Sequence, residues 1–259
     1  MQSFNLHTHT YRCHHAFGYD EQYIQAAIDA KMEVIGFSEH MPYPNVEIES
    51  ERMFNKDVDE YLNVMKSLKE KYKNKIKILV GFEIEYYDDQ KDYLLSMKDK
   101  CDYFIIGQHY KYFDGYNYDF YCSDEDVLMY ASQIEKALDL GITKYVAHPD
   151  FFMLGRRTFN EACQKAAHII CKAAIKNDAV LEINLNGLRY GQLYFDEMKY
   201  AYPFRDFFHI ASQYHCKVCY GYDAHKPVTL LEKKRIEKCQ EILKGLPLQF
   251  ILSFNELKL

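Results

Sequence analysis

The sequence predicts an α/β fold in which a seven-stranded parallel sheet is covered by helices, as in a TIM barrel that is short by one unit. Three observations predict this fold. The chain has 259 residues, 48% of them hydrophobic, which is enough to bury a substantial core. Short apolar runs alternate with longer helical patterns along its length. Only 11 Gly and 6 Pro are present and no linker-like stretch is visible, so residues 1–259 are expected to form one domain.

Seven segments rich in β-branched and aromatic residues have the length and composition of buried strands. They cover residues 4–7, 34–38, 76–83, 103–107, 144–148, 180–184 and 217–221. Strands that alternate with helices pair in parallel. An open doubly wound sheet is the competing arrangement to the barrel.

Seven helical patterns separate or follow these strands. They cover about residues 20–31, 57–73, 89–98, 125–140, 160–177, 204–215 and 229–244. Two have recognisable ends, because Asn160 is a suitable N-cap and Gly141 a suitable C-terminal stop. The acidic stretch 47–59 has little periodicity and is expected to lie on the surface.

Composition excludes several classes of function. The chain has 38 acidic and 32 basic residues, a net charge of −6, which argues against nucleic-acid binding through a global positive field. A small anionic substrate remains compatible, because local cations can reverse the local sign. No signal peptide or stretch of 18 apolar residues is visible, so no membrane contact and a cytoplasmic location with eight reduced cysteines are expected. The oligomeric state is left open.

Six of the seven predicted strands end in a residue that can bind a metal ion. The six ends are His7-Thr8-His9, Ser38-Glu39-His40, Gly81-Phe82-Glu83, Gly107-Gln108-His109, Ala147-His148-Pro149-Asp150 and Gly221-Tyr222-Asp223-Ala224-His225. The carboxyl ends of the strands form one rim of an α/β barrel, where active sites are built. We therefore expect these side chains to meet at one mouth.

The spacing of these residues suits metal chelation. In an extended segment His7 and His9 share a face and can hold one cation between them, and Asp223 and His225 repeat this geometry. Imidazoles combined with carboxylates suit Zn, Mn or Fe. Nine candidate ligands exceed the roughly four to six positions of one ion, so two to three divalent metal ions are expected.

Other polar residues have simpler interpretations. His168, His209 and His215 lie on predicted helices and are expected to be hydrogen-bonded core residues. Glu39 and Glu85 are expected either to support ligands or to lie on the surface. Asp150 could orient His148 or begin a loop, and these alternatives are evenly balanced.

These motifs resemble those of a known family. His7-Thr8-His9-Thr10, His15, Ser38-Glu39-His40, Gly81-Phe82-Glu83, His109, Ala147-His148-Pro149 and Asp223-Ala224-His225 resemble, in order, the motifs of the PHP (polymerase and histidinol phosphatase) superfamily. The likeness to its monofunctional histidinol-phosphatases is carried by Cys13-His14-His15-Ala16, Glu39-His40-Met41-Pro42 and Asn184-x-Asn186-Gly187-Leu188-Arg189.

The resemblance implies a distorted (β/α)7 TIM-like barrel with a trinuclear metal site at the C-terminal ends of the strands. It implies one metal on His7, His9, Glu83 and Asp223, a second on the bridging Glu83 with His109 and His148, and a third on His15, His40 and His225. The spacing from the first motif favours His15 over its neighbour, which leaves His14 as a candidate substrate contact.

The activity implied is hydrolysis of L-histidinol phosphate to L-histidinol and phosphate, a step of histidine biosynthesis. We expect a metal-bridging hydroxide to attack phosphorus, with Glu83, Asp223 and His225 as the catalytic residues. The phosphate needs a planar cation, and Arg189, Arg156 or Arg157 follows a predicted strand and could bind it.

Two rival functions remain. A PHP phosphoesterase could act on another substrate, such as a nucleotide, a nucleic-acid end or a phosphotyrosyl protein. A non-catalytic PHP domain could serve as a scaffold, although such a domain would be expected to have lost ligands, and this chain retains all nine.

Overall fold

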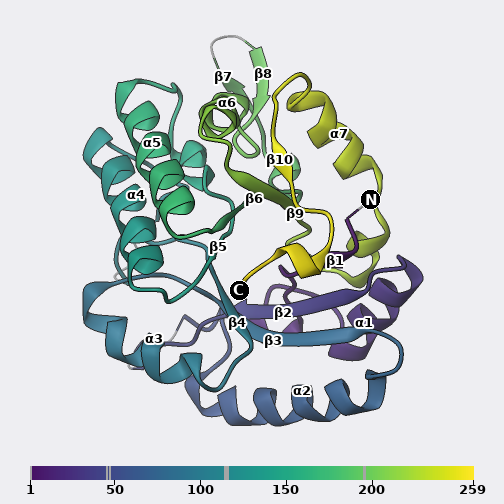
Figure 1. Ribbon diagram of the computed structural model, residues 1–259. Helices are drawn as coiled ribbons and strands as arrows, with labels where there is room; N and C mark the ends of the chain where they lie inside the picture. The colour runs from purple at the N-terminus through teal and green to yellow at the C-terminus, as the bar shows by residue number, and fades with distance from the viewer. Residues whose placement is uncertain (1, 45, 47, 114–116, 195–196) are drawn as a thin grey trace.

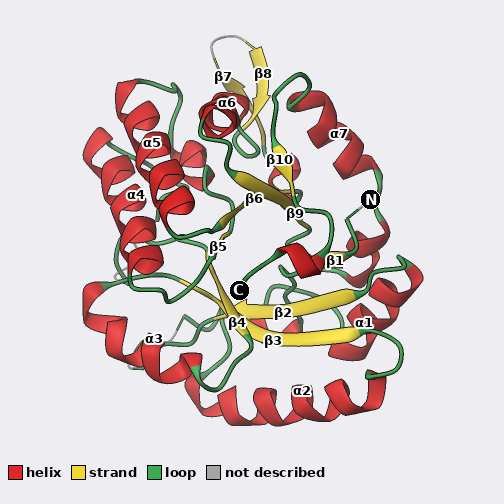
Figure 2. Ribbon diagram, in the orientation of Figure 1, coloured by secondary structure: helices red, strands yellow, loops and turns green. Residues whose placement is uncertain are grey.

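Among the described residues, eight parallel strands form one curled sheet with helices on its outer face (Figures 1 and 2). The structure is a computed structural model that describes residues 2–44, 46, 48–113, 117–194 and 197–259. The strand order is β1-β2-β3-β4-β5-β6-β9-β10. Their bounds are Phe4–Asn5, Val34–His40, Lys77–Ile84, Tyr103–Ile106, Tyr145–Val146, Val180–Asn184, Lys217–Gly221 and Gln249–Phe250. Neighbouring strands follow the order of the chain, so the sheet is TIM-like and the doubly wound alternative is excluded.

In the described part of the chain seven α-helices alternate with these strands, and each overlaps one of the predicted helical patterns. They are α1 (Asp20–Asp29), α2 (Val58–Tyr72), α3 (Lys91–Lys98), α4 (Asp124–Asp139), α5 (Glu161–Lys176), α6 (Arg205–Gln213) and α7 (Lys234–Ile242). The side chain of Asn160 caps α5 as predicted, and Gly141, with φ +64°, follows the end of α4. Helices α4 and α5 lie side by side against the sheet (Figure 1).

The segments that follow β1 and β9 pair with each other at the carboxyl-end rim of the sheet. Thr8 and Ala224 form a parallel bridge, in which the His9 amide donates to the Ala224 carbonyl (3.0 Å) and the Ala224 amide to the His7 carbonyl (3.2 Å). At the opposite end the Ser3 amide donates to the Leu252 carbonyl (2.9 Å). Residues near the start and near the end of the chain therefore meet at the rim.

Alternation along the strands divides the barrel interior into an apolar part and a polar part. Leu79 and Glu83 share one face of β3, and Val180, Glu182 and Asn184 share one face of β6. The earlier residues join an apolar cluster with Phe4, Leu6, Val34, Tyr103, Ile105, Tyr145, Ala147, Cys219 and Ile251, against which Phe254 and Leu257 pack. The later, polar residues stand at the carboxyl ends of the strands.

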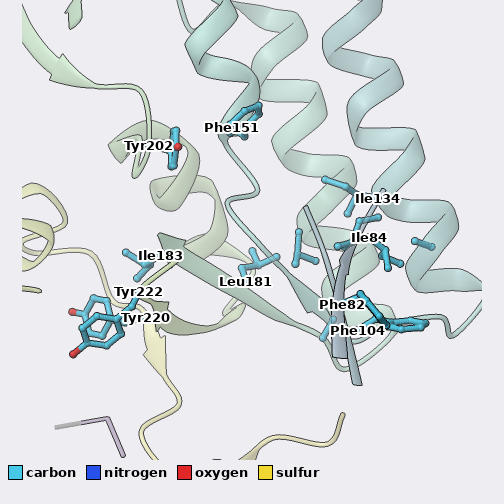
Figure 3. Close-up of a cluster of buried hydrophobic side chains, with 14 of the residues drawn as sticks. Phe82, Ile84, Phe104, Ile134, Phe151, Leu181, Ile183, Tyr202, Tyr220 and Tyr222 are labelled. Carbon is cyan, nitrogen blue, oxygen red and sulfur yellow. The ribbon is translucent and has the colours of Figure 1, made fainter. Parts of the chain in front are cut away.

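A larger apolar layer separates the sheet from the helices. Figure 3 shows part of it, where Phe82 and Phe104 lie close together and Ile84 and Ile134 connect the strands to α4. This layer holds the strands in register, and it therefore fixes where their carboxyl ends emerge.

The structure adds features that the sequence pattern did not predict. The eighth strand β10 has only two residues, and β7 (Gly191–Tyr194) and β8 (Glu197–Tyr200) form a separate antiparallel pair. The predicted helix 229–244 is divided into a 3-10 turn at Pro227–Leu231 and α7. Among the described residues no helix combines the length and the apolar character that crossing a bilayer requires.

Candidate metal centre

All nine predicted ligands meet at the carboxyl-end rim of the sheet. Each has a ring nitrogen or carboxylate oxygen within 3.5 Å of such an atom in another member of the set. The set comprises His7, His9, His15, His40, Glu83, His109, His148, Asp223 and His225. A cavity of about 320 Å³ is lined by all of them except His7 and His9, which are fully buried.

Four of these residues bring their ligand atoms close together. Nε2 of His7 and Nε2 of His9 lie 3.0 Å apart, and each lies 3.3 Å from Oε2 of Glu83. Oδ1 of Asp223 lies 3.6 and 3.5 Å from the same two nitrogens. A zinc ion about 2.0–2.1 Å from four such donors would place them about 3.3–3.4 Å apart, so the donor set fits a cation of this kind.

The two oxygens of Glu83 face different partners. Oε2 faces His7 and His9, whereas Oε1 lies 2.8 Å from Nε2 of His148 and 3.5 Å from Nε2 of His109. Glu83 is 1% exposed, and Gly107 leaves room for it, since a Cβ at this glycine would lie 1.8 Å from Oε1. The carboxylate is therefore placed to bridge two cation positions.

A third group lies nearer the solvent. Nε2 of His15 and Nε2 of His225 are 3.0 Å apart, and Nδ1 of His40 lies 3.2 Å from Oε2 of Glu83. Ligand atoms of His9, His40 and His225 all lie within 4.8 Å of one another. The third group is thus adjacent to the first.

The tautomers of four imidazoles follow from their surroundings. In each, Nδ1 faces an oxygen that can only accept, so it must carry the hydrogen and Nε2 is directed at the centre. The contacts are His7 to Glu182 (2.9 Å), His15 to the Cys13 carbonyl (2.8 Å), His225 to the Asp223 carbonyl (3.0 Å) and His109 to Glu85 (3.3 Å). Nitrogen lone pairs that converge at 3.0 Å repel one another unless a proton or a metal cation lies between them.

Electrostatics favour the forms of these groups that bind metals. Burial would raise the pKa of Glu83 and of Asp223, but the surrounding histidines hold both well below their usual range. Burial lowers the pKa of His9 to about 3 and that of His40 well below its ordinary value. Anionic carboxylates and neutral imidazoles are the protonation states that coordinate cations.

The pKa values of two histidines are instead raised by nearby carboxylates. Burial lowers the pKa of His7, but Glu182, Glu83 and Asp223 outweigh it and raise the pKa well above its ordinary value. The carboxylates near His109 likewise raise its pKa to about 9. A cation bound at either imidazole would replace a proton.

The backbone at two of the nine positions is strained. Asp223 has φ +45° and His148 has φ +27°, in or near the left-handed region that residues with a Cβ seldom occupy. Such strain persists only where the surrounding structure imposes it, and it concentrates at functional sites.

The four predicted substrate-binding residues are placed differently. Arg189 is exposed and lines the cavity, with its guanidinium 4.7 Å from the ring of Tyr190. Arg156 donates to the Cys122 carbonyl (2.7 Å) and to Asp124 (2.6 Å). Arg157 and His14 are exposed and do not line the cavity within the described part of the chain, and His14 hydrogen-bonds the Glu49 carbonyl.

Sequence reasoning missed two buried charged residues behind the centre. Glu182 is fully buried on β6, where it accepts hydrogen bonds from His7, Tyr145 (2.8 Å) and Asn184 (2.7 Å). A charged residue within the apolar run 180–184 was the signal that could have revealed it.

Arg52 lies in the stretch that was expected to be on the surface, but it is 2% exposed. It forms a two-point ion pair with Glu85 (3.1 and 3.2 Å) and donates to the Met41 carbonyl (2.8 Å). Glu85 is buried as well, so it does not lie on the surface, and it contacts the predicted ligand His109.

Asp150 does not touch His148 through any hydrogen bond in the described residues. It accepts from the Phe204 amide (2.5 Å) at the start of α6. Of the three helical histidines, His168 contacts the Tyr214 hydroxyl, whereas His209 and His215 are exposed and not buried as expected. All eight cysteines lie in described ranges and are free.

The chain was compared with known proteins. The family model described as the PHP domain matches residues 5–186. Over 116 residues the chain is 35% identical to a protein of Schizosaccharomyces pombe named "Probable histidinol-phosphatase", a match that covers 40% of this chain and 38% of that protein. A protein of the same name from Deinococcus radiodurans is 30% identical over 107 residues, which cover 40% of this chain and 41% of that one. The matches thus span about two fifths of either relative.

Among solved structures, the chain resembles a histidinol phosphate phosphatase from Lactococcus lactis subsp. lactis Il1403 in complex with zinc, L-histidinol and phosphate. The TM-score is 0.69 at 18% identity, and the alignment covers 96% of this chain and 95% of that one. At this identity the likeness concerns the fold.

Proposed function

Since this chain belongs to the PHP domain family, we propose that it is a metal-dependent phosphomonoesterase whose substrate is L-histidinol phosphate. The observation that carries the proposal is the convergence of nine imidazole and carboxylate side chains at one rim of the sheet, seven of which line one cavity. The curated relatives named as histidinol-phosphatases support the choice of substrate. So does the similar fold that was solved with L-histidinol and phosphate.

We propose three groups of ligands for divalent cations, zinc, manganese or iron among them. The groups are His7, His9, Glu83 and Asp223; Glu83, His109 and His148; and His15, His40 and His225. Cations held there would neutralise the charge of the phosphoryl oxygens and lower the pKa of bound water from about 15.7 toward about 7. We propose Glu83, Asp223 and His225, which line the cavity and belong to these groups, as the catalytic residues.

The remaining walls of the cavity suit the rest of the substrate. Arg189 supplies the planar cation that matches phosphate oxygens, whereas the guanidinium of Arg156 is engaged by Asp124. Phe151 and Tyr202, both labelled in Figure 3, have ring centroids 5.5 Å apart. Both residues line the same cavity. Flat aromatic walls of this kind can stack on an imidazole ring.

A panel of phosphomonoesters tests the substrate. The protein reconstituted with Zn²⁺, Mn²⁺ or Fe²⁺ would be assayed on histidinol phosphate, a nucleoside monophosphate, a 3′-phosphorylated oligonucleotide and a phosphotyrosyl peptide. We expect the highest kcat/KM for histidinol phosphate. A higher value for another substrate would keep the phosphoesterase activity and reject this substrate, and no turnover on the whole panel would favour a scaffold role.

Variants test the residues. Glu83→Gln should abolish turnover and reduce bound metal, because it removes the charge shared by two ligand groups. Arg189→Ala should mainly raise KM, and Arg156→Ala serves as its control, with KM unchanged. Equal KM increases in both arginine variants would contradict the assignment of the phosphate to Arg189.

A further inference from the structure

Strand β6 is the one predicted strand that ends without a proposed ligand, yet polar side chains are buried at its end. Asn184 is fully buried and Asn186 is 4% exposed. β6 pairs with β9, and Asn184 lies opposite Gly221, two residues before Asp223. The two asparagines therefore lie beside a proposed ligand of the first cation group.

The two carboxylate oxygens of Asp223 have separate sets of partners. Oδ1 lies 3.6 Å from Nε2 of His7 and 3.5 Å from Nε2 of His9, and it lies 3.2 Å from Nδ1 of His225. Oδ2 accepts hydrogen bonds from the side-chain amides of Asn184 (3.2 Å) and Asn186 (3.0 Å). One oxygen is thus turned toward the cation position and the other is held by two N–H donors.

The orientation of the Asn184 amide is determined by its neighbours. Its oxygen accepts from the backbone amides of Asn186 (2.8 Å) and Gly187 (3.0 Å). Its nitrogen donates to two carboxylates, Glu182 (2.7 Å) and Asp223. A flipped amide would set oxygen against carboxylate oxygen and nitrogen against N–H groups, so the donor must face Asp223.

We propose that Asn184 and Asn186 are positioning residues that keep Asp223 a one-oxygen ligand. This inference rests on the metal centre of the proposed function and goes beyond it. If Oδ2 were released, Asp223 could turn both oxygens to the first cation and add a fifth protein donor to a set of four. That extra oxygen would occupy a position that a substrate oxygen or water needs.

An amide suits this task better than a histidine or an acid would. It has no charge to gain or lose near neutral pH, so its hydrogen bonds to Asp223 do not depend on protonation. Asn184 also links Asp223 to Glu182, which holds His7. Glu182 and Asn184 on β6 thereby orient His7 and Asp223, two ligands of the proposed first group.

The experiment replaces Asn186 by leucine, which has a similar shape and no donor, in the full-length protein loaded with Co²⁺. Asn184→Leu is the second variant, in case the first does not fold. The readouts are metal content, the visible absorption of Co²⁺, kcat and KM. Gln133→Leu is the matched control, because this buried amide bonds to Tyr118 and Lys111, away from the ligands.

We expect unchanged metal content, a weaker Co²⁺ absorption as the coordination number rises, and kcat about 10–100-fold lower with KM changed much less. Crystals of the metal-free variant should show the Asp223 side chain in a different conformation from the one described above. The control should lower the melting temperature and leave the Co²⁺ spectrum unchanged. An unchanged Co²⁺ spectrum in both asparagine variants, or equal spectral changes in the control, would overturn the proposal.

The experiment on the two asparagines can fail or succeed independently of the test of the substrate. The Co²⁺ spectrum and the apo structure report on Asp223 whether or not histidinol phosphate is the substrate. A protein that changes spectrum as expected but hydrolyses another phosphomonoester would retain the role of the two asparagines and reject the substrate.

Discussion

Replacing Arg52 by methionine tests whether the buried ion pair behind His109 stabilises the protein. The substitution keeps much of the side-chain length but removes both contacts to Glu85 and the hydrogen bond to Met41. Both partners are almost fully buried, at 2% and 1% exposed. Removing one member of such a pair leaves an uncompensated charge and costs about 3–5 kcal/mol.

For a chain of this size, that loss corresponds to a decrease in melting temperature of about 6–20 °C. Thermal unfolding followed by circular dichroism at pH 7, with and without chelator, measures it. Lys176→Met is the control, because its pair with Asp139 is exposed and should contribute less than about 1 kcal/mol.

The stability lost in the Arg52→Met variant should depend on pH, because Glu85 titrates. Burial alone would raise its pKa, but Arg52 and His109 outweigh burial and lower it. In the wild type this carboxylate therefore adds stability above its unfolded pKa of about 4.3, and the gain is lost as the pH falls through the folded value. Without Arg52, burial should raise the pKa of Glu85, so the deficit of the variant should shrink as the pH is lowered toward 4.

The double variant Arg52→Met with Glu85→Gln gives the sharpest test. It leaves no unpaired buried charge, so its cost should be smaller than the sum of the two single costs by at least about 1 kcal/mol. Strict additivity, or a single-variant cost equal to that of Lys176→Met, would refute the reasoning.

Three further predictions concern the metal centre. Gly107→Ala would place a Cβ 1.8 Å from Oε1 of Glu83, so the protein should bind less metal and lose activity. Full metal content of the variant, measured by atomic absorption, would contradict this prediction. Glu182→Gln removes the charged acceptor of His7 and should weaken metal binding about 10–100-fold, as measured by competition with a chelator; equal affinity would show that the charge has no role. Ions at 100 times their dissociation constant should stabilise the fold by about 2.7 kcal/mol, so identical melting curves with and without chelator would argue against binding to the folded state.

The strands and the polar residues at their carboxyl ends could be predicted from the sequence, because both are recognised from residues that are adjacent in the chain. A short apolar run that ends in His, Glu or Asp identifies a buried strand and a rim residue together, as at Glu83 and His148. Parallel strands place those ends on one side whatever their separation in the chain. The capping of α5 by Asn160 was equally local.

The supporting residues were harder to predict, because their role depends on contacts between distant segments. Arg52 lies within an acidic stretch without periodicity, and only its contact with Glu85 shows why it is buried. The short strand β10 has two residues, too few for a period to be visible. Arg156 follows a strand, as a phosphate-binding residue would, but local contacts with Asp124 and Cys122 engage it.

The bridge between Thr8 and Ala224 has a consequence for how the protein is assembled. The proposed first ligand group combines His7, which follows β1, with Asp223, which follows β9, so the intervening segment must be ordered before the group exists. Closing so long a loop carries a large entropy cost, and contacts distant in sequence form slowly. A nascent chain therefore lacks the proposed first ligand group until β9 has docked. Cation binding at this group, unlike binding at the proposed group of Glu83, His109 and His148, would mark completed folding.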